Sequence, residues 1–259
     1  MAEKIIHVAE NFWNIRGSFR IGGVVDIGTQ ASLVQLPSGN FLLLDSYSFS
    51  DPVRKEIDAI VGDDEIEAIL NLHPFHTIHV ERTHELFPNA RLHGTQRHLD
   101  LFPELPWEEV RCEDQELHEW YSDDLDFTIP RGVDFISANE NVHFASVLVY
   151  HRASDTIHVD DTLMYIRLPR LLSLVGLPDR VGFHPTLAMA LQKREGAATE
   201  FRDWTAELTD TWSEAKNLCA AHSGNLLDKT NRGASLRERI GKAARRCELI
   251  LGKHERRYG

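Results

Sequence analysis

The sequence predicts an α/β fold in which a parallel or mixed β-sheet is covered by helices. From Ile5 to Tyr47, short apolar segments alternate with turn signals, a pattern typical of antiparallel strands. From residue 40 the order becomes strand, helix, strand, helix, strand, which is typical of parallel strands joined by helices. Neither pattern requires a disulfide or a metal for folding, because 259 residues can bury a large apolar core.

The first half of the chain gives the clearest individual elements. LPSGNFLLLD predicts a hairpin loop followed by a buried strand. DPVRKEIDAIVG predicts a helix with Asp51 as N-cap, Pro52 in the first turn and Gly62 at the end. EIEAILNLH predicts a buried strand, ERTHELF a short helix and NARLHG a further strand.

The second half predicts more strands and two long helices. VDFISA, ASVLVYHR and DTIHVDD have strand character, and NLCAAHSG predicts a short strand and loop. The apolar stretch 168–191 predicts an interrupted helical region that covers the sheet or forms a subunit contact. ATEFRDWTAELTDTWSEAK predicts an amphipathic helix, and SLRERIGKAARRCELILGKHERR a basic C-terminal helix. We therefore expect one domain over 1–259 with a helical extension at about 232–259.

Charge, cysteine content and the N-terminal residues bear on the partners and the compartment of the protein. The formal net charge of -12 disfavours nucleic acid and anionic membranes, since both are bound through clustered Lys and Arg. Three widely spaced cysteines predict neither a disulfide framework nor a thiolate zinc site. The N-terminal residues lack the apolar run of a signal peptide, so we expect a cytoplasmic protein.

Histidines and aspartates gather where predicted strands end. Fourteen histidines is many for this length, and NLHPFHTIHVERTH places His73, His76, His79 and His84 just beyond a buried strand. His143 precedes a later strand, Asp160 and Asp161 end TIHV, and His222 follows NLCAA. Loops at the carboxyl ends of strands bring such side chains together, and neutral imidazole is the commonest nitrogen ligand for zinc or iron. These segments predict a metal site.

The same segments resemble the metallo-β-lactamase superfamily. Its hallmark is a His-x-His-x-Asp-His loop after a buried strand, then a lone His, an Asp at a strand end and a final His. AILNLH resembles the strand and first His, and NVHFASVLVY, TIHVDDTL and NLCAAHSG resemble the three later elements, over roughly residues 20 to 230. The resemblance implies an αββα sandwich, with two mixed β-sheets packed together and flanked by helices.

The loop departs from that hallmark. Counting from His73, the next positions hold Phe75, Thr77 and Ile78, and counting from one residue later does not restore the Asp either. In the superfamily this Asp ligates a second metal and often orients the attacking water, so a mononuclear site is expected here. FPNARLHGTQRHLDLFPELPW and VYHRASDTIHVDDTL are more similar to an uncharacterised branch of the superfamily with a degenerate loop.

The resemblance and the His pattern together predict a metal-dependent hydrolase of a small ester, lactone, thioester or amide. The expected metal is zinc, with iron and manganese as alternatives. Asp161 and Asp160 are the expected catalytic residues, and Asp45 is expected to brace the site loops. The predicted metal ligands are His73, His76, His79, His143, Asp161 and His222.

Two other functions fit the same residues. The broken loop also suits a non-catalytic binding domain, and a His and carboxylate set also suits an iron-dependent redox protein. The expected partner is a small-molecule substrate, and the apolar stretch 168–191 suggests a possible homodimer.

Overall fold

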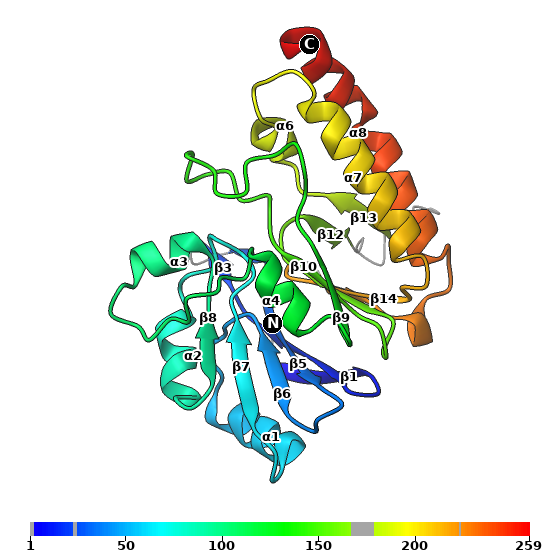
Figure 1. Ribbon diagram of the computed structural model, residues 1–259. Helices are drawn as coiled ribbons and strands as arrows, with labels where there is room; N and C mark the ends of the chain where they lie inside the picture. The colour runs from blue at the N-terminus through cyan, green and yellow to red at the C-terminus, as the bar shows by residue number, and fades with distance from the viewer. Residues whose placement is uncertain (1–2, 23–24, 167–178, 223) are drawn as a thin grey trace.

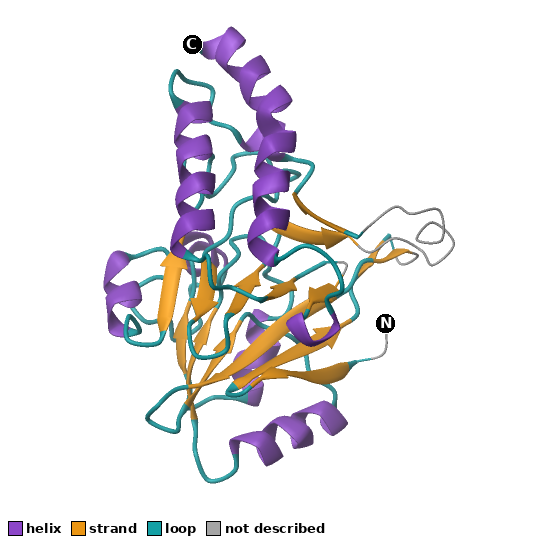
Figure 2. Ribbon diagram, turned by 90° about the vertical axis from the view of Figure 1, so that its right-hand side faces the viewer, coloured by secondary structure: helices purple, strands orange, loops and turns teal. Residues whose placement is uncertain are grey.

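The computed structural model describes residues 3–22, 25–166, 179–222 and 224–259, which form two β-sheets packed face to face (Figure 1). The first sheet has six strands in the order β1-β2-β5-β6-β7-β8, and the second has five in the order β15-β14-β11-β10-β9. Helices cover the outer face of each sheet, so the layers run helix, sheet, sheet, helix (Figure 2). The predicted αββα sandwich is confirmed.

The first sheet changes from antiparallel to parallel pairing along its width. β1, β2, β5 and β6 pair antiparallel, and β7 and β8 then join β6 in parallel, as the strand and helix order predicts. Its strands and helices are β1 (Lys4–Ala9), β2 (Phe12–Gly17), β5 (Thr29–Gln35), β6 (Phe41–Leu44), β7 (Ile66–Leu70), β8 (Arg91–His93), α1 (Asp51–Val61), α2 (Val80–Leu86) and α3 (Gln96–Leu101).

Both faces of this sheet are buried, which explains its nearly continuous apolar strands. Leu33 and Leu43 pack with Ile57 of α1 in the helix layer, whereas the alternate residues Leu42 and Leu44 face the second sheet. The helix itself begins after Ser50, which occupies the N-cap position; the prediction of Asp51 as N-cap was wrong by one residue. Asp51 lies instead in the first turn, where its negative charge interacts favourably with the positive end of the helix dipole.

The second sheet carries the other half of the core. β11 pairs in parallel with β14 and antiparallel with β10, and Phe201 and Trp204 of α7 cover its outer face. Figure 1 shows α7 and α8 lying side by side, with the C-terminus at the tip of α8. The elements are β9 (Leu125–Thr128), β10 (Leu148–His151), β11 (Thr156–Val159), β14 (Asn217–Ala220), β15 (Gly224–Leu226), α4 (Gln115–Trp120), α7 (Ala197–Thr211) and α8 (Leu236–Tyr258).

Two segments differ from prediction. VDFISA forms no strand: Val133 makes an isolated bridge to Leu191, directly after Gly132, which has a φ of 73°. In the apolar stretch 168–191, residues 168–178 lie outside the described part, and the rest forms β13 (Arg180–Phe183) and the short α6 (Leu187–Ala190) instead of a longer helix. β13 pairs with β12 (Leu163–Ile166), and β3 (Arg20–Ile21) pairs with β4 (Val25–Asp26).

Cys112, Cys219 and Cys247 are buried free thiols. Among the described residues, no helix is both long and apolar enough to cross a membrane.

Candidate metal centre

Three strand ends bring the candidate ligands to one edge of the sandwich. His73 follows β7, Asp160 and Asp161 follow β11, and His222 follows β14. β11 and β14 run parallel, so their carboxyl ends lie at the same edge, opposite the end of β7 in the facing sheet. His73 and both aspartates are almost completely buried.

The Asp161 carboxylate is surrounded by three imidazole rings. Its Oδ2 lies 3.4 Å from Nε2 of His73 and 3.6 Å from Nε2 of His76, and its Oδ1 lies 3.1 Å from Nε2 of His222. The ligand atoms of His73, His76 and Asp161 all lie within 4.8 Å of one another. His222 lies outside that group of three and contacts the other oxygen of the same carboxylate. Imidazole nitrogens and a carboxylate oxygen are ligands that zinc takes.

The tautomers of two rings bear on whether a metal fits. Nδ1 of His222 donates to the Gly28 carbonyl at 2.8 Å, which makes Nε2 of the neutral ring the nitrogen with a lone pair toward Asp161. Two acceptors facing each other at 3.1 Å call for a proton or a cation between them. Nε2 of His73 is buried and has no hydrogen-bond partner within the described ranges. The two facing acceptors of His222 and Asp161 fit a metal at this point.

One contact at His73 must change when a metal binds. The Phe75 amide donates to Nδ1 of His73 at 3.0 Å, so the neutral ring carries its proton on Nε2. A neutral ring that ligates through Nε2 carries its proton on Nδ1 instead. The Phe75 hydrogen bond is therefore incompatible with the metal-bound form, and the 73–76 turn must adjust on loading.

Burial disfavours the charged forms of the site's histidines and aspartates, whereas attraction between the imidazole rings and the carboxylates favours them. Burial lowers the pKa of His73 well below its ordinary value, and the neighbouring charge of His76 adds to this. Burial also disfavours the charged His76 ring, but the carboxylates of Asp160 and Asp161 outweigh it and raise the pKa of His76. For Asp161, burial raises the pKa, but the neighbouring His222, His76 and His73 rings outweigh burial and hold the pKa well below its usual range.

A second buried group consists of Asp45, His158 and Asp160, and it adjoins the first because Asp160 precedes Asp161 in the chain. Asp45, which has a φ of 62°, accepts from the Leu72 amide at 2.8 Å and from Nε2 of His158 at 2.7 Å. It thus braces the segment before His73. Neither oxygen of Asp160 has a hydrogen-bond partner in the part of the chain described, and Oδ1 lies 3.5 Å from Nδ1 of His76. Burial and the nearby Asp45 raise the pKa of Asp160 to about 6.

His143 and His79 stand apart from this group, on the walls of the cavity beside it. Nε2 of His143 donates to the Glu140 carbonyl at 2.7 Å, and the ring stacks on Phe75 at 4.7 Å. Nδ1 of His79 lies 2.9 Å from the Ser48 hydroxyl. Neither belongs to the group of ligand atoms of His73, His76 and Asp161 that lie within 4.8 Å of one another, and their roles as ligands stay predictions.

The cavity has a volume of about 510 Å³, within the range of small-molecule sites. Its described charged lining residues outside the histidines are Asp161 and Glu140, and the latter pairs with Arg97 at 2.6 Å. The cavity is lined by Phe19, Ile27, Thr29, Ser46, Phe75, His76, Thr77, Ile78, His79, Glu140, Asn141, His143, Asp161, His184 and His222.

A buried polar network between the sheets holds the strand ends, and sequence reasoning missed it. The Arg16 guanidinium donates to the carbonyls of Ala220 at 2.6 Å and Ala221 at 2.8 Å, immediately before His222. Gln30 donates to the carbonyls of Val159 and Cys219, at the ends of β11 and β14. The sequence gives only a weak signal for this network. Asn14 and Arg16 in β2, and Gln30 and Ser32 in β5, are polar residues two positions apart in strands that are otherwise mostly apolar.

The comparisons with known proteins agree on the fold. The metallo-β-lactamase FIM-1 from Pseudomonas aeruginosa, solved in its mono-zinc form, superposes with a TM-score of 0.59 at 11% identity, covering 96% of this chain and 97% of that one. An enzyme from Erythrobacter litoralis gives 0.60 at 13% identity, covering 94% and 96%. One from Pontibacter korlensis gives 0.57 at 10% identity, covering 94% and 99%.

No protein-family model and no curated protein matches the sequence. The chain has the metallo-β-lactamase fold, and its candidate metal-binding residues lie at one edge of that fold.

Proposed function

We propose that this protein is a metal-dependent hydrolase with a mononuclear site, formed by His73, His76, Asp161 and His222. The observation that carries the proposal is the buried Asp161 carboxylate, faced by three imidazole nitrogens at 3.1 to 3.6 Å. Zinc suits this donor set best, with iron and manganese as alternatives. When bound, the metal would polarise a substrate carbonyl or phosphoryl oxygen and lower the pKa of bound water.

Asp160 acts through His76 in this proposal. It does not line the cavity, but its Oδ1 lies 3.5 Å from Nδ1 of His76. A carboxylate at that nitrogen holds the ring proton on Nδ1 and leaves Nε2 to ligate. We therefore assign Asp160 a positioning role, while Asp161 supplies the ligand carboxylate.

His79 is the better-placed proton acceptor. Its ring lines the cavity, Nδ1 lies 2.9 Å from the Ser48 hydroxyl, and Nε2 is buried without a hydrogen-bond partner among the described residues. Burial, followed by the nearby His76, lowers its pKa, which favours the neutral ring that a general base requires. We propose that His79 replaces the loop Asp that the sequence lacks.

The substrate proposed is a small ester, lactone, thioester or amide. Phe19, Ile27, Phe75 and Ile78 give the cavity an apolar wall, and Ile78 is 69% exposed at its edge. Such a wall favours an apolar acyl or alcohol group over a highly charged one.

A hydrolysis panel tests this proposal. Zinc-loaded, manganese-loaded and chelated protein are assayed against aryl and alkyl esters, lactones, thioesters and anilides. We expect turnover that requires metal, falls at least about a hundredfold in His79→Gln and is unchanged in His7→Gln, a variant on the distant β1 strand. Metal binding without turnover of any substrate would favour a non-catalytic binding domain. Redox-dependent visible absorbance would favour the iron alternative.

A further inference from the structure

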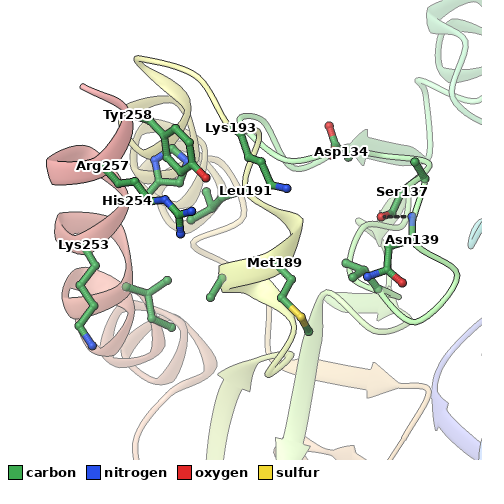
Figure 3. Close-up of a pocket in the computed structure, with 14 residues that line it drawn as sticks. Asp134, Ser137, Asn139, Met189, Leu191, Lys193, Lys253, His254, Arg257 and Tyr258 are labelled. Carbon is green, nitrogen blue, oxygen red and sulfur yellow. Dashed lines mark hydrogen bonds between the residues drawn. The ribbon is translucent and has the colours of Figure 1, made fainter.

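A second cavity lies on the other side of the segment that carries His143. It has a volume of about 720 Å³ and opens between residues 134–142, α6 and the C-terminal turns of α8 (Figure 3). Asn139 and Val142 line this cavity, whereas Glu140, Asn141 and His143 line the metal-site cavity. The two cavities therefore share a wall but no described lining residue.

Three cations surround the second cavity without a counterion. Lys193, Lys253 and Arg257 all line it, and none has an ion-pair partner within the described ranges. Elsewhere on the same surface, arginines such as Arg194 and Arg202 pair with glutamates. Arg257 also lies over the Tyr258 ring, at 5.2 Å from its centre. In a chain with a net charge of -12, three cations that line one cavity without a carboxylate partner favour an anion there.

Few carboxylates of the protein compete with an anionic ligand for the cations of this cavity. Asp134 is the carboxylate among the described lining residues, and Figure 3 shows it on the wall opposite α8, whereas Lys193 points toward the space between the two walls. The local balance is therefore three cations to one carboxylate, and a dianion would be attracted more strongly than a monoanion.

The floor of the cavity is apolar and held in place. Val142 and Leu191 are buried, and Met189 is 56% exposed at the edge. Nε2 of His254 donates to the Gln192 carbonyl at 2.8 Å, which ties α8 to the segment that carries Lys193. Opposite, the Ser137 hydroxyl accepts from the Asn139 amide at 3.1 Å and fixes that turn. The walls are thus set before any ligand arrives.

We propose that this cavity binds a small phosphate monoester with an apolar body. The phosphate would lie between Lys193 and Arg257, because an arginine fork and an ammonium group match its charge and acceptor oxygens, and Lys253 on the outer side of α8 would add to the attraction (Figure 3). The apolar body would cover Met189 and Leu191. This site requires no metal and is separate from the proposed hydrolytic function.

Calorimetric titration of the metal-free protein tests the proposal, with hexyl phosphate, 1-hexanol and inorganic phosphate as probes. We expect saturable one-to-one binding of hexyl phosphate, weaker binding of inorganic phosphate and none of hexanol. Lys253→Gln/Arg257→Gln is expected to weaken hexyl phosphate about tenfold or more. Arg245→Gln/Arg256→Gln is the matched control, because it removes the same charge from exposed positions of α8 that do not line the cavity.

A third variant separates the two parts of the ligand. Met189→Ser is expected to weaken hexyl phosphate severalfold and to leave inorganic phosphate unchanged. Equal weakening by both double variants would overturn the proposal, since it would indicate only non-specific attraction to α8. Saturable binding of an acidic peptide, with no binding of hexyl phosphate, would also overturn it and assign the surface to a protein partner.

Discussion

Replacing Arg16 by Met should damage metal binding much more than folding. Arg16 is 2% exposed, and burial lowers its pKa from 12.5 to about 10, although the charges of Cys219 and Asp160 act in the opposite direction. At about 1.4 kcal/mol per tenfold change, holding this charge inside costs about 3 kcal/mol. Replacing the charged side chain removes this unfavourable contribution. It also leaves the carbonyls of Ala220 and Ala221 without a hydrogen-bond donor, which destabilises the fold by about 1 to 3 kcal/mol for each carbonyl.

The opposing contributions nearly cancel in global stability, so we expect a loss of about 0 to 3 kcal/mol. The local effect does not cancel, because both carbonyls directly precede His222. Loss of such support to a ligand typically weakens metal affinity about 10- to 100-fold. Urea denaturation of the metal-free protein and competition with a chromophoric chelator measure the two quantities separately.

Arg202→Met is the control for this experiment. Arg202 bridges α7 and α8 through Glu248 and Glu255, away from the strand ends, and its loss should leave metal affinity unchanged. Metal affinity that is equally unchanged in Arg16→Met would refute the positioning role of the buried network.

Three further predictions concern the rest of the fold and the loading step. Burial lowers the pKa of His151 to about 4, so as the pH falls the unfolded state binds the proton before the folded state does. About 3 kcal/mol of stability should therefore be lost between about pH 6.5 and pH 4. Urea denaturation of His151→Leu should show a smaller loss over the same pH range. Gly132→Ala should cost at least about 2 kcal/mol, since φ is 73° and a Cβ would lie 2.0 Å from a backbone carbonyl oxygen; Gly62→Ala, with φ 65° and open space, should show only the milder backbone cost in the same thermal melts. The Phe75 amide should exchange with deuterium faster after metal loading, because its bond to His73 is lost, and unchanged or slower exchange would contradict the tautomer argument.

Most of the fold could be predicted because burial imposes simple periodicities. Apolar strands buried on both faces and a helix flanked by Pro52 and Gly62 are local patterns that the tertiary structure kept. VDFISA was predicted wrongly because Val133 and Phe135 pack against the core without regular pairing, and Ile136 is 38% exposed. Periodicity reports burial, and it cannot distinguish a strand from an irregular buried segment.

The site was predictable in kind but less so in detail. Strand ends pointed to His73, Asp161 and His222, because parallel strands deliver their following residues to one edge. The register of the 73–79 loop could not be derived, since it depends on how His76 reaches between Asp160 and Asp161. Nor could the network around Arg16, whose partners are backbone carbonyls more than 200 residues away in sequence.

Metal content tests the central claim most directly. Elemental analysis by mass spectrometry would compare the wild-type protein, purified without added metal, with the His73→Ala/Asp161→Ala variant. We predict about one equivalent of zinc, iron or manganese in the wild type and its loss in the variant. Two equivalents would contradict the mononuclear site and point to Asp45, His158 and Asp160 as the ligands of a second ion. Substoichiometric metal in both proteins, even after reconstitution, would contradict the metal centre itself.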